Sequence, residues 1–245
     1  MKDRVDRGGI VYEMARSDIR HRTSTMPPPP PLPPWRAPLA AAIAACTGPL
    51  PSVGALATVT PAGTPAVRSV NVRGWPEPST YTFISDGRSA KAGELAATSA
   101  TELCFHFPDT REQYRLSGEA VVLGPASRGD DGGRDQGGVG GGAGRDDDPA
   151  PPVGARPTAW RGLGASAREW FFWGPPGAPL GTDRPSADAA TEGVAADTPP
   201  DAFVVVEVQV VRAERLQLGV TPFVRTVYEA GRGEDGGWSA VEVNP

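Results

Sequence analysis

Cysteine and histidine are scarce in this sequence of 245 residues. The two cysteines are Cys46 and Cys104, and the two histidines are His21 and His106. Two cysteines are too few for a disulfide framework or a cysteine-rich zinc site. Two isolated histidines are too few for a metal cluster or a Ser-His-Asp triad. We therefore predict no metal site, and we interpret both cysteines as reduced residues of the core or its margin.

Positive charge and long apolar runs are also in short supply. The formal net charge is −5, which argues against nucleic acid as a partner, because a phosphate backbone is neutralised by a basic face. The longest apolar stretch, Pro38 to Cys46, falls well short of the roughly 20 residues that span a bilayer. There is no clear targeting signal, whether translation starts at Met1 or at Met26. The sequence thus predicts an intracellular, cytoplasmic protein with no nucleic-acid or membrane partner.

Glycine and proline, by contrast, are abundant, with 31 and 28 residues concentrated in a few stretches. Such stretches lack the apolar surface that offsets the entropy of ordering a chain. We predict a disordered, proline-rich tail over residues 1–34 and flexible insertions at 125–157 and 183–200. Without these stretches roughly 160 residues remain, enough for a single domain within residues 35–245.

The remaining segments have the pattern of a small antiparallel barrel. Leu103, Phe105 and Phe107 alternate with polar residues, which is the period of a half-buried strand. A turn containing Gly63 separates two strand-like segments, as in a hairpin. The fold class predicted is mainly β: an antiparallel β-barrel of about nine strands with two or three short helices. Helices are expected at 36–47, 89–98 and 160–172, and the last strands at 203–211, 213–218, 223–229 and 238–243.

Cationic and hydroxyl residues gather at the predicted ends of elements between Arg68 and Lys91. Arginine and lysine make charge-assisted bonds to phosphate. Ser85 and Ser89 flank a helix start, where free N–H groups and the helix dipole favour an anion. Arg68 and Arg73 have opposite strand parity, so they reach one ligand only through a bulge or twist, or if two subunits share the site. The alternative is that each is a solvated surface charge or a helix cap.

These segments resemble a known family. The pattern consists of Arg68-x-Val70-x-x-Arg73, Phe83-Ile84-Ser85-Asp86 with Arg88-Ser89-x-Lys91, Glu112-Gln113-x-Arg115, and Ser166-x-Arg168 followed by Arg225 near the C-terminus. It is similar to the pyridoxamine 5′-phosphate oxidase-like FMN-binding split barrels. Within that family it is most similar to stand-alone FMN-binding domains distinct from the authentic oxidase.

The resemblance implies FMN as cofactor and a homodimer with FMN at the subunit interface. It implies that the phosphate and ribityl chain are held by Arg68, Arg73, Ser85, Ser89 and Lys91. It further implies contacts through the backbone and apolar surface of Val70 and Ile84, a place beside the isoalloxazine ring for Gln113, and an approach from the C-terminal strands for Arg225.

The implied function is that of a flavin-dependent oxidoreductase acting on an unidentified small substrate. No side chain stands out as a catalytic acid or base. One alternative is a non-catalytic module that binds flavin or presents the proline-rich tail to a partner. Another is the authentic oxidase, which the sequence disfavours: Thr221 and Phe223 stand where its Arg-x-His substrate pair would fall, and Ala90 replaces an arginine.

Overall fold

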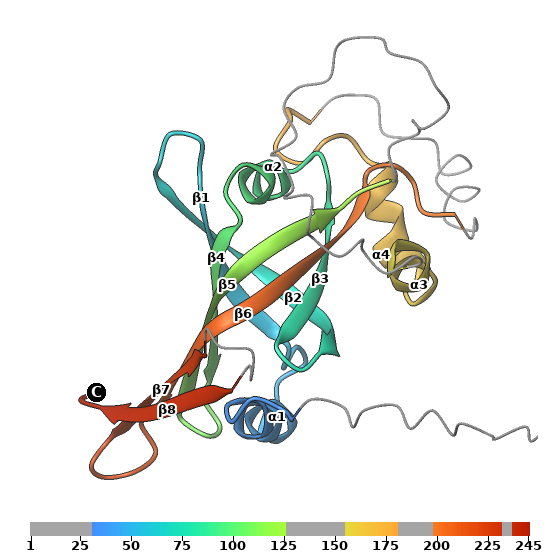
Figure 1. Ribbon diagram of the computed structural model, residues 1–245. Helices are drawn as coiled ribbons and strands as arrows, with labels where there is room; N and C mark the ends of the chain where they lie inside the picture. The colour runs from blue at the N-terminus through green and yellow to red at the C-terminus, as the bar shows by residue number, and fades with distance from the viewer. Residues whose placement is uncertain (1–30, 126–154, 181–197, 232–236) are drawn as a thin grey trace, which may run out of the picture. The chain divides into compact units, whose positions relative to one another are not determined.

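A computed structural model of the protein describes residues 31–125, 155–180, 198–231 and 237–245 (Figure 1). Most of the predicted tail and of both predicted insertions lies outside these ranges. Within the described ranges, no helix is long and apolar enough to cross a membrane. The elements are α1 (Arg36–Ala45), β1 (Val53–Val59), β2 (Pro65–Glu77), β3 (Thr80–Asp86), α2 (Ala90–Ala97), β4 (Ala100–Phe107), β5 (Glu112–Leu123), α3 (Ala155–Arg161), α4 (Ala165–Glu169), the 3-10 helix η1 (Trp170–Phe172), β6 (Phe203–Gln217), β7 (Val224–Ala230) and β8 (Trp238–Val243).

The strands form one antiparallel sheet in the order β3-β2-β1-β4-β5-β6-β7-β8. A further pairing between β3 and β6 closes the first six strands into a barrel. The 15-residue β6 serves both parts of the sheet, because its first half pairs with β3 and its second half, from Arg212, pairs with β7. β7 and β8 therefore continue the sheet outside the barrel. The predicted mainly β split barrel is confirmed.

One continuous strand, β6, stands where the sequence predicted two. β5 pairs along almost all of β6, and the register shifts by one residue where Ser117 pairs with Arg212 and Gly118 with Val210, so that Val211 of β6 is the extra residue. A Cβ atom on Gly118 would lie 2.2 Å from the carbonyl oxygen of Gln209, so only glycine allows this close approach. The strand β6 therefore continues through a one-residue bulge at Val211, beside which Gly118 lets the two backbones approach closely.

The helix predicted over 160–172 is instead three short pieces, α3, α4 and η1. Gly162 and Gly164 lie between α3 and α4, and glycine in a helix interior costs about 1 kcal/mol relative to alanine. α3 also begins at Ala155, so the last residues of the predicted insertion are helical.

The apolar interior of the barrel is closed at one end by α1, while α2 lies at the other end (Figure 1). Leu39 and Ala42 of α1 are buried in the same cluster as the inward-facing residues of the strands. Trp35, directly before α1, is fully buried, and its ring lies 5.9 Å from that of Trp75 and 5.8 Å from that of Trp238. Apolar packing therefore closes the α1 end of the barrel. The buried polar residues described below lie at the α2 end.

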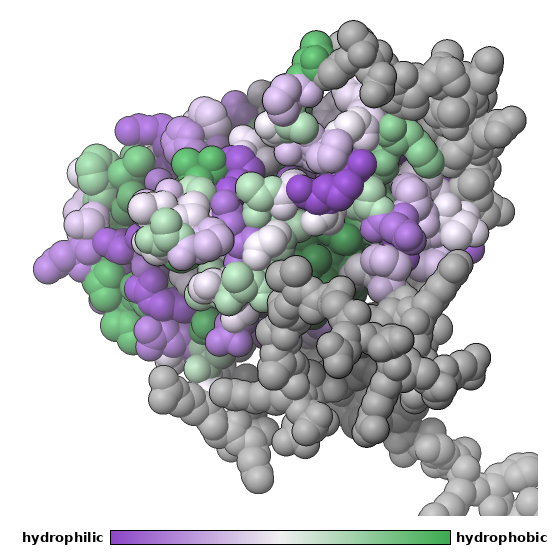
Figure 2. Space-filling view, turned by 90° about the horizontal axis from the view of Figure 1, so that it is seen from above, coloured by the Kyte–Doolittle hydropathy of each residue, from purple (hydrophilic) through white to green (hydrophobic). Residues whose placement is uncertain are grey.

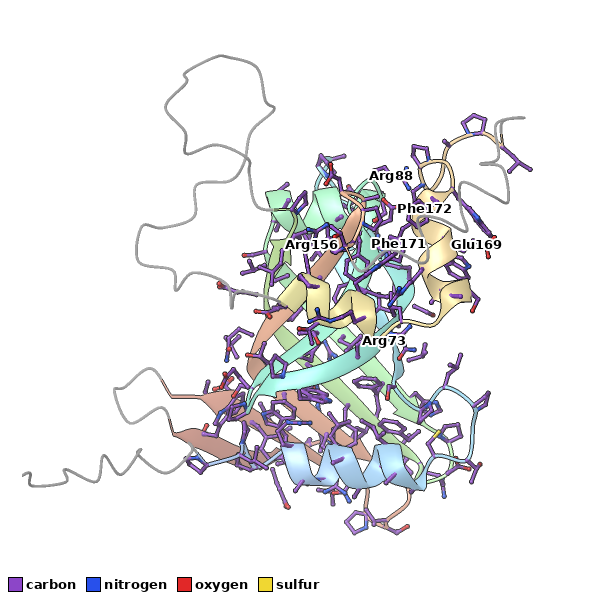
Figure 3. All side chains as sticks on the ribbon, turned by 90° about the vertical axis from the view of Figure 1, so that its right-hand side faces the viewer. Arg73, Arg88, Arg156, Glu169, Phe171 and Phe172 are labelled. Atoms are coloured by element: carbon purple, nitrogen blue, oxygen red, sulfur yellow. The ribbon has the colours of Figure 1, made fainter. Side chains whose placement is uncertain are left out.

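A second apolar cluster attaches α3, α4 and η1 to the outside of the barrel. The ring of Phe203 on β6 lies 5.2 Å from that of Trp160 and 4.9 Å from that of Phe171. Arg88 donates to the carbonyl oxygens of Phe171 and Trp173, and Figure 3 shows it beside Phe171 where η1 meets the barrel. Arg88 directly precedes Ser89, the N-cap residue of α2, so these contacts tie the helical segment to the start of α2.

Candidate functional site

Four of the residues predicted to bind FMN lie together at the α2 end of the barrel. Arg68 pairs across the sheet with the buried Leu56, so its side chain is on the inner face of β2. The Oγ atoms of Ser85 on β3 and Ser89, the N-cap residue of α2, are 3.2 Å apart. Lys91 Nζ lies 3.4 Å from Ser89 Oγ. The hairpin of β2 and β3 and the start of α2 thus bring two cations and two hydroxyl groups into one place.

A buried carboxylate completes this group. Glu94 of α2 is 6% exposed. It accepts hydrogen bonds from Thr58 Oγ of β1 and, at 2.7 Å, from Arg68 Nη2. Arg68 Nη1 also donates to Thr58 Oγ. We call the six residues Thr58, Arg68, Ser85, Ser89, Lys91 and Glu94 the α2 cluster.

The charges of the α2 cluster are unequal. Burial, together with the nearby Arg68 guanidinium, lowers the pKa of Lys91. The hydrogen bond from Thr58 and the contact with Arg68 lower the pKa of Glu94, which keeps it ionised. Glu94 pairs with Arg68, whereas Lys91 has no ion pair within the described residues. One positive charge is therefore left over in a half-buried position.

The hydroxyl and N–H groups of the α2 cluster suit an anion as well. Ser85 and Ser89 are buried, and Ser89 Oγ donates to the carbonyl oxygen of Asp86 rather than capping α2. The first N–H groups of α2 therefore have no side-chain cap, and these are the groups that bind phosphate at helix N-termini. Figure 2 looks onto this end of the barrel and shows hydrophilic and hydrophobic residues interspersed where the surface is coloured. The α2 cluster can hold a phosphate group.

Gln113 and Arg225 lie elsewhere, on the outer face of β5 and β7. They line a hollow of about 90 Å³ with Arg115, Glu214 and Leu216. We call these five residues the outer-face cluster. The register places Gln113 opposite Leu216, and Leu216 opposite Arg225. Figure 1 shows β7 toward the end of the barrel opposite α2, so one copy of the chain does not bring this cluster to the α2 cluster.

Arginine side chains in and beside the outer-face cluster are paired with carboxylates. Glu214, which is 5% exposed, receives hydrogen bonds from Arg225 and Arg212. Arg115 Nη1 approaches Glu214 Oε2 at 3.6 Å, and Arg115 also pairs with Glu102 at 2.7 Å. Burial alone would raise the pKa of Glu214, but the hydrogen bonds from Arg225 and Arg212 outweigh it and lower the pKa. The hollow therefore offers polar contacts with little excess charge.

The other three predicted residues are not part of the α2 cluster. Val70 lies in the barrel core, and Ile84 packs against the second apolar cluster on the outside. Arg73 is exposed and follows the outward-facing positions Val67 and Ser69 of β2. Figure 3 places it on the side of the barrel that carries α3 and α4. The register of β2 against β3 does shift between Val72 and Gly74, yet Arg68 and Arg73 stay on opposite faces.

Sequence reasoning did not predict five residues of these clusters as site residues: Thr58, Glu94, Arg115, Glu214 and Leu216. Glu94 stands three residues after Lys91 on α2, so helical spacing put the two on one side of the helix. Thr58 pairs with Glu94 across 36 positions of the sequence, and no local pattern indicates such a contact. Glu214 lies in a strand, and the alternation of that strand identifies it as a polar position without indicating that it is buried or paired with arginines.

Residues 32–124 match the family model described as "pyridoxamine 5′-phosphate oxidase, FMN-binding domain". The chain is 40% identical to the pyridoxine/pyridoxamine 5′-phosphate oxidase of Novosphingobium aromaticivorans over 76 residues. This aligned segment is 31% of this chain and 37% of that protein. It is 38% identical over 73 residues to the oxidase of Sinorhizobium fredii, 30% of this chain and 35% of that protein. The match thus spans little more than a third of the length of these relatives.

Solved structures extend the likeness beyond this segment. A pyridoxamine 5′-phosphate oxidase-related, FMN-binding protein from Nostoc punctiforme superposes with a TM-score of 0.70 at 28% identity, covering 88% of this chain and all of that one. PhzG from Burkholderia lata, in complex with tetrahydrophenazine-1-carboxylic acid, has the same fold, with a TM-score of 0.65 at 21% identity over 88% of this chain and 94% of that one. Residues 32–124 thus match the FMN-binding domain of the pyridoxamine 5′-phosphate oxidase family, and the likeness in fold to the FMN-binding split barrels extends over most of the chain.

Proposed function

We propose that the α2 cluster binds the phosphate of FMN and that the bound flavin serves oxidation or reduction of a small substrate. The observation that carries this is the surplus charge of Lys91, which is half-buried, has no ion pair within the described residues and lies 3.4 Å from Ser89 Oγ. A dianionic phosphate there would meet Lys91, Arg68, two hydroxyl groups and the uncapped start of α2. The donor set fits a phosphate monoester.

The flavin ring needs a second set of contacts, which we assign to the outer-face cluster of another copy of the chain. Gln113 offers an amide donor and acceptor for the ring edge, and Arg225 lies beside it. Because both lie far along the barrel from α2, a homodimer with FMN between the subunits reconciles the two clusters. The outward-facing Arg73 would then also lie on a face available to the partner subunit.

FMN supplies hydride chemistry when bound, and the protein supplies position and electrostatics. In this proposal Lys91 and Arg68 hold the phosphate, and Ser85 and Ser89 orient it. We assign no proton-transfer residue. We also do not assign oxidation of pyridoxamine 5′-phosphate, because Thr221 and the half-exposed Phe223 offer neither a cation nor an imidazole to such a substrate. Arg225 is already engaged by Glu214.

The test is a titration of the purified full chain with FMN, followed by visible absorbance and thermal unfolding. At a hundredfold excess over the dissociation constant, FMN should add about 2.7 kcal/mol to the free energy of unfolding. Sedimentation with and without FMN should give a dimer in the bound state. A chain that shows neither bound flavin nor stabilisation contradicts the proposal.

Anaerobic reduction of the bound flavin by NADH or NADPH, followed by reoxidation with an added acceptor, tests the redox part separately. If the protein is an oxidoreductase, the visible absorbance of its flavin should bleach on reduction and recover on reoxidation over repeated cycles. Tight FMN binding without any such cycle would favour the non-catalytic flavin-binding module instead.

A further inference from the structure

Glu94 is an unexpected residue for a phosphate site, because a carboxylate repels phosphate. It is buried, and its Oε2 accepts from both Thr58 Oγ and Arg68 Nη2. An uncharged glutamine could accept the same two hydrogen bonds. The geometry therefore calls for an acceptor at this position, and the negative charge needs a separate explanation.

The explanation lies in the two cations of the α2 cluster. Arg68 and Lys91 are close enough for the guanidinium to lower the pKa of Lys91, whereas Glu94 acts on Lys91 in the opposite sense. Asp86 favours the charged form of Lys91 more strongly than Glu94 does, but its carboxylate is engaged by Arg88 through Nε and Nη2. Glu94 is the carboxylate that pairs with Arg68 and also acts on Lys91, so it offsets the repulsion between the two cations.

Building on the proposed function, we propose that Glu94 is a built-in counter-anion that stabilises the α2 cluster without ligand and weakens its hold on the FMN phosphate. A phosphate within reach of Arg68 and Lys91 also lies near the Glu94 carboxylate, and like charges at low local dielectric repel strongly. The residue acts through Arg68 and Lys91 and touches no reacting atom. Its charge sets the affinity for the phosphate and leaves the ring contacts alone.

The discriminating variant is Glu94→Gln, which keeps the acceptor and removes the charge. The readout is the ratio of the dissociation constants of riboflavin and FMN, because these ligands differ only in the phosphate. We expect the variant to raise this ratio at least about threefold, with riboflavin affinity unchanged. Its melting temperature without flavin should fall below that of the parent. A ratio that stays the same or falls overturns the proposal.

The matched control is Glu242→Gln, which removes the same charge from an exposed position on β8 at the opposite end of the barrel. It should leave the ratio of the two dissociation constants unchanged. An equal rise of the ratio in this control would mean that only the net charge of the protein matters, and would overturn the proposal. If Glu94→Gln fails to fold without ligand, it is prepared with saturating FMN, whose phosphate should replace the missing charge. Failure to fold even then also overturns the proposal.

A measurement without flavin separates this inference from the proposed function. A parent chain that binds neither flavin contradicts the proposed function itself. The Lys91 ammonium can still be titrated by NMR in parent and Glu94→Gln protein. Counter-anion behaviour predicts a lower pKa for Lys91 in the variant, and an unchanged pKa overturns it.

Discussion

The α2 cluster and the outer-face cluster each hold a buried glutamate paired with arginine, and they have different charge balances. In and around the outer-face cluster, Arg115, Arg212 and Arg225 all reach the buried carboxylate of Glu214. In the α2 cluster, Glu94 pairs with Arg68 and leaves Lys91 over. If the α2 cluster is an anion site, as we propose, then a cation without a carboxylate partner is what distinguishes it from the outer-face cluster. The number of arginines alone does not distinguish such a site from a structural ion-pair network.

The largest effect is expected from Glu214→Ala, which leaves the arginines around it without their shared partner. Full burial of an uncompensated charge costs roughly 3–5 kcal/mol. Here the side chains of Arg115, Arg212 and Arg225 are 37%, 35% and 31% exposed, so water relieves part of the cost. We expect the free energy of unfolding to fall by about 2–3 kcal/mol, measured by chemical denaturation without flavin.

Glu229→Ala is its control, because Glu229 pairs with Arg212 at 3.5 Å while 62% exposed. Exposed ion pairs contribute little, so the change should stay below about 1 kcal/mol. Equal losses in the two variants would mean that Glu214 does not organise the outer-face cluster.

The next largest effect is expected from Lys91→Met, which removes the surplus cation of the α2 cluster. A charge-assisted bond contributes about 1.5–3 kcal/mol, so FMN should bind about 10- to 100-fold more weakly, with riboflavin unaffected. The flavin-free protein should not lose stability, because burial already disfavours the charged lysine. Fluorescence titration with both ligands measures the effect.

Arg212→Met removes the same charge near the outer-face cluster and serves as the matched comparison. It should lower the stability of the fold and leave the ratio of the two flavin affinities unchanged. If Arg212→Met and Lys91→Met change that ratio alike, the distinction between the two clusters fails.

A smaller effect should follow from pH. In the protein without ligand the pKa of Lys91 is lowered. A fraction of the molecules therefore has a neutral Lys91 at pH values below the usual lysine pKa of about 10.4. FMN binding favours the protonated form, and FMN affinity should therefore fall as the pH rises through the lowered pKa. The flavin-free protein should instead gain stability over the same rise, because the unfolded chain holds that proton more tightly. Lys91→Met should abolish this part of both profiles.

The smallest effect is expected from Gln113→Ala. A neutral hydrogen bond contributes about 0.5–1.5 kcal/mol, so affinity should fall by no more than about tenfold. FMN and riboflavin should weaken equally, because they share the ring. Loss confined to FMN would place Gln113 near the phosphate and merge the two clusters into one.

Most of the barrel could be predicted from alternation and turn residues. The half-buried pattern of Leu103, Phe105 and Phe107 gave β4, and the proline, serine and glycine positions bounded the helices α1 and α2 closely. The division of α3 from α4 and the continuity of β6 were not predictable in this way. The continuity of β6 goes with the close approach of Gly118 to the backbone of Gln209, and a single sequence does not reveal that neighbour.

Four of the predicted site residues meet in the α2 cluster, but the contacts within that cluster were less predictable. Strand parity already indicated that Arg68 and Arg73 diverge, and they do. The start of α2 at Ala90 follows from the extended backbone of Ser89. The partnership of Thr58, Arg68 and Glu94 joins three separate elements, so only the folded chain reveals that Arg68 is already paired.

The most direct measurement is a pair of titrations on the parent protein, one with FMN and one with riboflavin. If the α2 cluster binds the phosphate, FMN should bind at least about tenfold more tightly, which corresponds to one charge-assisted contact or more. Equal dissociation constants would show that the phosphate meets no cation, and would contradict the assignment of Arg68 and Lys91.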